Sequence, residues 1–289
     1  MMGLQDTSSH EVSRVMRVVE IRGGPQTLSK GSLVELWAFR EVLWAFVVRH
    51  VKVKYKQAAV GVGWAVLQPV LSAALFALFL GRLARVPSEG VPYLIFAMAG
   101  MVGWTFFSTA AGSAMESIVV DQVLLRKVYF PREVLPIASV GAALIDLLVG
   151  LITLAIAAGL VGLRPDLTWI ALPLPLLVVV TFATAIGIGF AAVNVYYRDV
   201  RYALPFLMQL GLFVSPVVYP LTLVPSTWRT IYAIVNPVAA AVDGVRRIMI
   251  HHSWPDFGIS AGALLWAAIL VVLAYAVFKR FERGFADRI

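Results

Sequence analysis

The segment from Val134 to Leu163 reads VLPIASVGAALIDLLVGLITLAIAAGLVGL and carries one charged side chain, Asp146. About 20 apolar residues in a helix are enough to cross the hydrocarbon core of a bilayer, so this segment predicts a membrane span. Apolar and polar residues do not alternate in it, which disfavours a strand of an outer-membrane barrel. Five further spans are predicted at Val62–Leu83, Pro92–Ala114, Trp169–Val195, Ala203–Val224 and Phe257–Phe278. Pro216 and Pro220 are expected to break the span at Ala203–Val224.

The composition of the whole chain agrees with a membrane protein. Of the 289 residues, 60% are hydrophobic and only 14% are charged, which is too little polar surface for a water-soluble fold. The net charge of +8 fits basic cytoplasmic loops that meet anionic lipid, so no nucleic-acid partner is expected. The sequence therefore predicts an all-α polytopic membrane protein with six transmembrane helices.

Three regions are expected along the chain. Residues 1–30 are polar and predict a cytoplasmic tail, and residues 58–289 hold the six spans. Between them, residues 31–57 predict a helix in the membrane interface followed by a basic segment. Trp37 and Trp44 would share one face of that helix, and Lys52, Lys54 and Lys56 would meet lipid headgroups.

The distribution of Lys and Arg predicts the orientation. With six spans, 18 of the 24 basic residues fall on the side of the two termini and six fall on the other side. Because cytoplasmic loops are enriched in Lys and Arg, both termini are expected in the cytoplasm.

The segment from Pro225 to Asp256 differs from the spans. Its two apolar stretches, Ile231–Val235 and Val238–Val242, are too short to cross a bilayer and are separated by Asn236-Pro237. They predict an external re-entrant helical hairpin between spans five and six, buried in protein or lining a cavity. An ordinary external loop is the alternative.

Sequence motifs of enzymes are missing. The chain contains no phosphate-binding G-x-x-x-x-G-K-[ST] loop, no H-E-x-x-H zinc motif and no G-x-S-x-G nucleophile motif. Without cysteine it has no thiolate chemistry, and His251-His252 is expected to be a solvated pair. We therefore expect no catalytic residue, no cofactor and no metal.

Some residues inside the predicted spans attract attention. Asp146 is an intramembrane charge, which marks a functional site by default, and an interhelical hydrogen bond or a subunit contact is favoured over proton transfer. Small residues recur four apart at Ala99/Gly103, Ala183/Gly187 and Ala185/Gly189, where either packing within one subunit or a dimer seam would use them. Deep aromatic residues in the first and fifth spans would pack against lipid or core, or would stack on sugar rings.

Four stretches together resemble one family. They are KVKYKQ (52–57) with GVGWAVLQP (61–69), NVYYRDV (194–200), SPVVYP (215–220), and NP (236–237) with GVR (244–246). In this order and spacing they resemble the permease subunits of type-2 ABC exporters of polysaccharides, such as the exporters of O-antigen and teichoic acid. The resemblance covers the chain from about Leu33 to its C-terminus.

The resemblance implies a homodimer in the bacterial cytoplasmic (inner) membrane, with a separate ATP-binding subunit. A lipid-linked polysaccharide would pass through a channel at the dimer interface. The loop between the second and third spans would couple to the ATPase, through Glu116, Asp121, Arg126, Lys127, Tyr129, Phe130 and Arg132. The first and fifth spans would line the channel, with Trp64, Gln68, Phe76, Phe206, Gln209, Phe213 and Tyr219.

Other functions remain open at this point. An ABC-2 permease for a lipid or a small drug would have the same overall organisation. A proton-coupled carrier would show inverted repeats and several buried carboxylates, and a membrane-embedded enzyme would show clustered polar residues within its spans. The sequence displays none of these last features.

Overall fold

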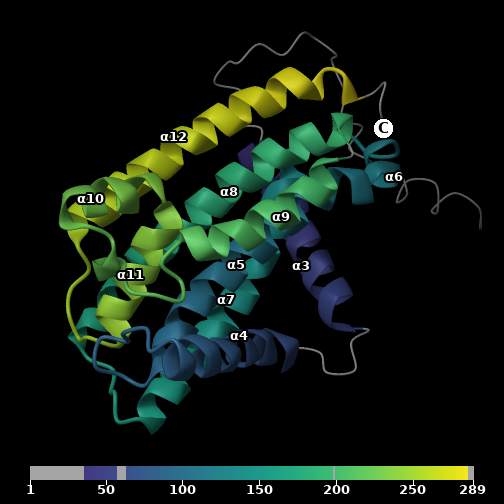
Figure 1. The fold of residues 1–289 in the computed structure, drawn as a ribbon. Coiled ribbons are helices and arrows are strands. Elements are labelled where there is room, and N and C mark those ends of the chain that lie inside the picture. The colour runs from purple at the N-terminus through teal and green to yellow at the C-terminus, as the bar shows by residue number, and fades with distance from the viewer. Residues whose placement is uncertain (1–35, 57–62, 198, 286–289) are drawn as a thin grey trace, which may run out of the picture. The chain divides into compact units, whose positions relative to one another are not determined.

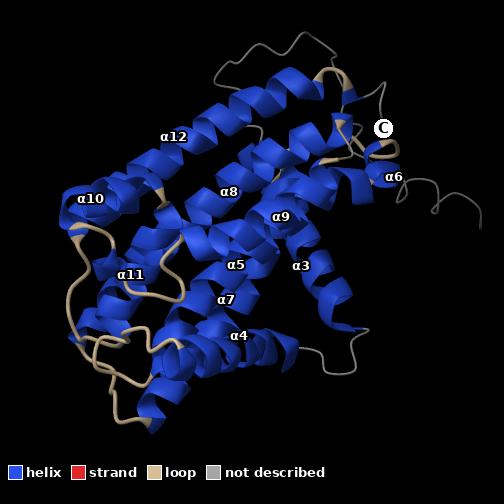
Figure 2. Cartoon of the chain, in the orientation of Figure 1, coloured by secondary structure: helices blue, strands red, loops and turns tan. Residues whose placement is uncertain are grey.

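The structure is a computed structural model that describes residues 36–56, 63–197 and 199–285. Within these ranges the regular structure is helical and contains no strand, as the all-α prediction requires (Figure 2). The predicted tail at 1–30 lies outside the described residues, as do Arg198 and the stretch 57–62, which includes Gln57.

Five helical segments in the described residues are long and apolar enough to cross a membrane. They are Gly63–Leu83, which joins α4 (Gly63–Phe76) to the π-helix η1 (Ala77–Leu83); α5 (Tyr93–Val120); α7 (Val134–Leu160); Leu167–Tyr196, which joins η2 (Leu167–Ala171) to α8 (Pro173–Tyr196); and α12 (Phe257–Glu282). Each corresponds to a predicted span, which confirms a multi-pass helical membrane protein.

The predicted fifth span is interrupted. Helix α9 (Val200–Val214) has 15 residues, and Ser215 after it is extended, with φ −82° and ψ 146°. Pro216 explains this ending, because a proline disfavours helical geometry in the residue before it and Pro itself offers no N–H group. The expected break of this span at its prolines is therefore confirmed, because α9 ends before Pro216. The short 3-10 helix η3 (Leu221–Leu223) follows the break.

Two short helices occupy the segment predicted as a hairpin. Helix α10 (Ser226–Val235) and helix α11 (Pro237–Met249) are separated by Asn236. The Asn236 side chain accepts a hydrogen bond from the Ala239 N–H at 3.3 Å, and Pro237 occupies the first turn, where its missing N–H is harmless. The Asn236 amide also donates to the Ser215 hydroxyl at 3.0 Å, which ties α11 to the end of α9.

Arg246 of α11 holds the break after α9 in place. This side chain is 2% exposed and donates to the backbone carbonyls of Phe96 (3.3 Å), Pro216 (2.7 Å), Val217 and Tyr219 (3.1 Å). Its guanidinium lies 3.6 Å from the centre of the Phe96 ring. The orientation count treats Arg246 as an external loop charge, but the structure buries it, because the proline break leaves carbonyls that need a donor.

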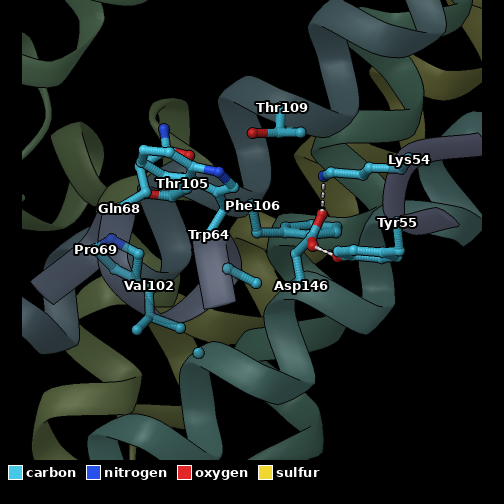
Figure 3. Close-up of a pocket in the computed structure, with 12 residues that line it drawn as sticks. Lys54, Tyr55, Trp64, Gln68, Pro69, Val102, Thr105, Phe106, Thr109 and Asp146 are labelled. Carbon is cyan, nitrogen blue, oxygen red and sulfur yellow. Dashed lines mark hydrogen bonds and ion pairs between the residues drawn. The ribbon is translucent and has the colours of Figure 1, made fainter. Parts of the chain in front are cut away.

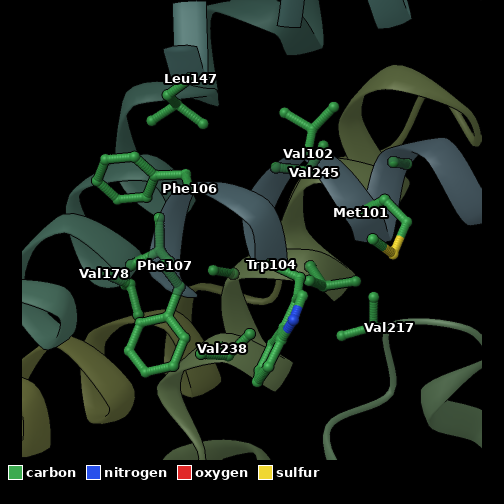
Figure 4. Packing of buried hydrophobic residues seen from close by; sticks show 14 of the residues in the cluster. Met101, Val102, Trp104, Phe106, Phe107, Leu147, Val178, Val217, Val238 and Val245 are labelled. Atoms are coloured by element: carbon green, nitrogen blue, oxygen red, sulfur yellow. The ribbon is translucent and has the colours of Figure 1, made fainter. Parts of the chain in front are cut away.

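Helix α5 forms the centre of the bundle. It packs against α4, α7, α8, α9 and α11, and its buried side chains interlock with those of the neighbouring helices (Figure 4). Small residues allow this close packing: a Cβ atom added to Gly187 of α8 would lie 2.6 Å from the Ala114 side chain of α5. Ala99, Ala183 and Ala185 are also buried inside the chain, so these small residues serve packing within one subunit.

The loops gather at two opposite ends of the bundle (Figure 1). At the first, which we name the tail end, the short helix α6 (Gln122–Leu125) lies near the end of α12, and Arg132 donates to the Glu282 carbonyl at 3.0 Å. At the other, which we name the hairpin end, Glu89 lies 2.9 Å from His251. Loops predicted on opposite sides of the membrane thus lie at opposite ends of the bundle.

Helix α3 (Arg40–Lys56) packs along α7. It includes the basic stretch that was expected to follow the interfacial helix. Phe46 is buried against Phe130, with ring centres 5.1 Å apart, and Val47 approaches Gly141 of α7. Trp44, in contrast, is 67% exposed. One side of α3 therefore belongs to the protein and the other is available to lipid.

Candidate functional site

Asp146 lies near the middle of α7 and faces the C-terminal end of α3. Lys54 forms an ion pair with its carboxylate, and the Tyr55 hydroxyl donates a hydrogen bond to it. The aspartate side chain is 11% exposed and that of Lys54 is 47% exposed. The charge that stood alone in the sequence is thus neutralised by a residue 92 positions away, and Lys54, which was expected at lipid headgroups, meets this carboxylate.

These three residues border a cavity of about 260 Å³. Its lining comes from α3, α4, α5 and α7 (Figure 3). Lys54 and Tyr55 meet Asp146 on one side, and Trp64, Gln68 and Pro69 lie on the other. The remaining lining residues are Ala65, Val102, Thr105, Phe106, Thr109 and Gly150. The lining of the cavity combines hydrogen-bonding groups of several kinds with apolar side chains.

The cavity brings together only part of the predicted channel lining. Trp64 and Gln68 line it together with the intramembrane charge Asp146. Phe206 and Phe213 lie on α9 instead, 60% and 57% exposed, and Gln209 is exposed on the same helix. Phe76 is half-buried against the core. The predicted lining thus divides between this cavity and an open face of α9.

Tyr219 stabilises the break after α9 and does not lie on the open face of that helix. Its hydroxyl donates to the carbonyls of Phe213 and Val214, at 3.1 and 2.9 Å, and lies 3.3 Å from the Tyr232 hydroxyl. These contacts satisfy carbonyl groups at the C-terminal end of α9, which the helix itself leaves unpaired. The structure therefore gives Tyr219 a positioning role between α9 and α10.

The predicted coupling residues fall into an exposed and a buried group. Arg126, Lys127 and Tyr129 are exposed at the tail end, beside Val123 and Val128. Glu116 is also partly exposed and pairs with Arg201 at 3.8 Å. Phe130, expected as a docking anchor, is only 4% exposed because it packs on Phe46, so of the two aromatic anchors Tyr129 alone reaches the surface.

Asp121 belongs to the buried group. Its carboxylate is 2.7 Å from the Arg49 guanidinium and 3.4 Å from the His50 ring. Burial raises the pKa of this carboxyl, but the hydrogen bonds from His50 and Arg49 outweigh it, and the pKa lies below the ordinary 3.8. Asp121 thus fastens the loop after α5 to α3.

Arg132 and Glu133 fasten the other end of the same loop to α12. The Arg132 guanidinium lies 5.5 Å from the Phe285 ring, in addition to its bond to Glu282. The fully buried Glu133 carboxylate accepts from Lys279 at 2.9 Å and from the Tyr275 hydroxyl at 3.0 Å. The loop is therefore held at both ends, with its exposed part between them.

Sequence reasoning missed several residues of the cavity. Lys54 was noted as part of a basic run and, with Tyr55, as part of the KVKYKQ motif, while Thr105 and Thr109 were not singled out. The two threonines are four residues apart on one helical face in an otherwise apolar span, which is a signal that could have been used. The pairing of Lys54 with Asp146 has no local signal. Among the described residues, no group of three or more possible metal ligands occurs.

Comparisons with known proteins agree with this organisation. The family described as "ABC-2 type transporter" matches residues 41–250, which is most of the chain. The O-antigen export system permease protein RfbA of Myxococcus xanthus is 29% identical over 249 residues, covering 86% of this chain and 94% of that protein. A Klebsiella pneumoniae protein of the same name is 24% identical, covering 83% and 91%.

A third relative carries a different substrate in its name. The polysialic acid transport protein KpsM of Escherichia coli is 21% identical over 246 residues, covering 83% of this chain and 93% of KpsM. These relatives are permeases and transport proteins, and they share nearly the full length of the described bundle. With the family match across α3 to α11, the chain belongs to the ABC-2 type transporter family.

Proposed function

We propose that this protein is the transmembrane subunit of an ATP-driven exporter of a lipid-linked polysaccharide. Two copies would form the transport path between them in the bacterial cytoplasmic membrane. The observation that carries the proposal is the similarity, over 83% or more of the chain, to permeases named for O-antigen export and to a polysialic acid transport protein. The absence of a phosphate-binding loop from the sequence assigns ATP hydrolysis to a separate subunit.

The faces of α4 and α9 support a path between two copies. In the segment of α4 and η1, only 11% of the most apolar stretch is buried, and α9 exposes Phe206 and Phe213. A polar polymer must be shielded across about 30 Å of hydrocarbon. The centre of a single bundle is filled by the side chains of α5, so the polymer would pass along the open faces of α4 and α9 from two copies.

The same path gives the break after α9 a role. Helix α9 is too short to cross a bilayer alone, and the segment 215–224 with η3 would complete a sixth crossing. Non-helical backbone is tolerated at membrane depth only inside protein or beside a water-filled space. Arg246 and Asn236 satisfy the polar groups of this break, and α10 and α11 would form a re-entrant hairpin on the external side.

The tail end would face the cytoplasm and receive the ATP-binding subunit. Between its two attachments, the loop 121–133 exposes Val123, Val128 and Tyr129 beside Arg126 and Lys127. Apolar and aromatic side chains ringed by charge are typical of a compact protein interface. Because Asp121 and Glu133 hold the loop to α3 and α12, movement of a bound ATPase would reach both helices.

Copurification with an ATP-binding subunit tests the function. The chain is expressed together with each candidate ATPase encoded near its gene, and the purified pair is reconstituted in lipid. We expect ATP hydrolysis to rise when a lipid-linked glycan is added. It should not rise when a lipid or a drug is added as a control. Stimulation by a lipid or a small drug alone would assign the protein to another substrate class.

A further inference from the structure

The cavity beside Asp146 contains polar groups that the protein leaves unused. Among the described residues, the side chains of Thr105, Thr109 and Gln68 make no hydrogen bond, although all three line the cavity. Some other hydroxyl groups in the spans bond to their own helix: Thr153 donates to the Val149 carbonyl and Thr184 to the Val180 carbonyl, both at 2.8 Å. Gln68 is exposed and the two threonines are partly exposed, so their polar groups are open to a ligand or to water.

The charges of the cavity indicate an uncharged ligand. Among the described residues, Lys54 and Asp146 are the only charged ones in its lining, and they neutralise each other. A phosphate or a carboxylate entering here would meet the Asp146 carboxylate and compete with it for Lys54. A neutral ligand with several hydroxyl groups avoids that repulsion, because each hydroxyl both donates and accepts.

The other surfaces of the cavity suit a ring with an apolar face. Trp64 is 55% exposed and offers an indole face. Val102, Phe106 and Pro69 add apolar side chains to the lining, among the polar groups. A pyranose ring combines C–H faces, which stack on aromatic rings, with hydroxyl groups around its edge, which need donors and acceptors.

We infer that this cavity binds one neutral glycosyl unit. This inference rests on the proposed function, since the unit would belong to the exported glycan. Asp146 accepts from ring hydroxyls in place of Tyr55, while Lys54 and the Gln68 amide donate to ring oxygens. Thr105 and Thr109 bond to the remaining hydroxyls, and Trp64 covers one face. The cavity lies among α3, α4, α5 and α7 of one subunit, and its residues Trp64 and Gln68 come from α4, one of the two helices along which the path is proposed.

Saturation-transfer NMR on the purified full-length protein tests this assignment. The probes are methyl glycosides of glucose, mannose, galactose and rhamnose, with methyl glucuronide and inorganic pyrophosphate as charged probes. At least one neutral glycoside should receive saturation. The double variant T105V/T109V, which keeps side-chain volume, should bind that glycoside roughly tenfold more weakly, the factor that one ordinary hydrogen bond contributes.

A matched control is T153V, because Thr153 lies on α7 and bonds to its own helix. It should leave glycoside binding unchanged, and the melting temperatures of all variants show whether each is folded. The variants W64L and D146N should also weaken binding. Equal binding by T105V/T109V and the wild type would overturn the inference, as would saturation of the charged probes alone or of no probe.

The outcome is separable from that of the proposed function. If the export complex remains active with its lipid-linked glycan while no glycoside binds the cavity, the inference fails and the function stands. If glycosides bind through Thr105 and Thr109 but no glycan stimulates the ATPase complex, the site stands and polysaccharide export fails.

Discussion

Helices α4 and α5 are neighbours of similar apolar character, yet the protein uses them in opposite ways. In α5, 78% of the most apolar stretch is buried, whereas in the segment of α4 and η1 the value is 11%. Ala110, Ala111 and Ala114 let other helices approach α5 closely, while α4 presents Leu67, Leu71 and further large side chains outward. Apolar composition thus identifies a span, but its neighbours decide whether the span is core or surface.

The largest loss of stability is expected for a side chain buried next to α5. Arg246→Met removes the donor of four backbone carbonyls and should destabilise the protein by about 3 to 5 kcal/mol, because buried carbonyls would lose their partners. Thermal unfolding of the purified protein measures this. Arg247→Met is the control, since Arg247 is 40% exposed and pairs with Asp243 within its own helix. Equal losses for both variants would contradict a special role for Arg246.

Two phenylalanine substitutions compare a buried position on α5 directly with an exposed position on α9. Phe106→Ala, at 1% exposure on α5, should cost about 3 to 5 kcal/mol of stability. Phe206→Ala, at 60% exposure on α9, should cost about 0.5 kcal/mol and yet reduce export of long glycans. Melting temperature and export per folded molecule are measured together. Normal export by Phe206→Ala, with lowered stability, would make α9 a packing face.

Close packing between α5 and α8 gives a smaller effect. Gly187→Ala should cost about 1 to 3 kcal/mol, because the added methyl group meets Ala114 at 2.6 Å. Gly112→Ala is the control, since no atom lies within 4 Å of the added group, and there the change should be neutral or stabilising. If both substitutions shift the melting temperature equally, the two helices are not in tight contact.

Features that depend on residues close together in the sequence could be predicted. Features that depend on contacts between residues far apart in the sequence could not. Five spans were found because their apolar length is a local property. The break in the fifth span was predicted as well, because Pro216 and Pro220 are local signals in the sequence. The burial of Arg246 was not foreseen, since its acceptors are carbonyls of residues 27 to 150 positions away.

The candidate site shows the same limit. Trp64, Gln68 and Asp146 were selected from the sequence for separate reasons, and the structure places them around one cavity. Their partners Lys54, Tyr55, Thr105 and Thr109 come from α3 and α5, so only the packing of α3 along α7 brings them together. Phe130 was misjudged because its burial depends on Phe46, far away in the sequence.

Another small effect is expected at the attachment of the tail-end loop. Asp121→Asn should cost about 1 kcal/mol near neutral pH, since the half-exposed Arg49 is partly screened by water. The folded pKa of Asp121 lies below its ordinary value, so its contribution is present above about pH 4 and is lost as the pH falls through the folded pKa. The difference in melting temperature between wild type and variant should therefore shrink at acidic pH.

Glu116→Gln is the control for that measurement, because Glu116 is 44% exposed and lies 3.8 Å from Arg201. Its melting temperature should follow that of the wild type at every pH. A difference for Asp121→Asn that stays constant from pH 7 to pH 3 would show that the carboxylate does not carry the attachment.

Photocrosslinking during export tests most directly whether the open faces of α4 and α9 carry the glycan. A photoreactive amino acid replaces Phe206 of α9, Leu71 of α4 or Leu273 of α12, three positions that are 53% to 60% exposed. In an actively exporting complex, the account predicts crosslinks to the glycan from positions 206 and 71 and none from position 273. Crosslinks from 273 alone, or equal labelling at all three positions, would contradict a glycan path along α4 and α9.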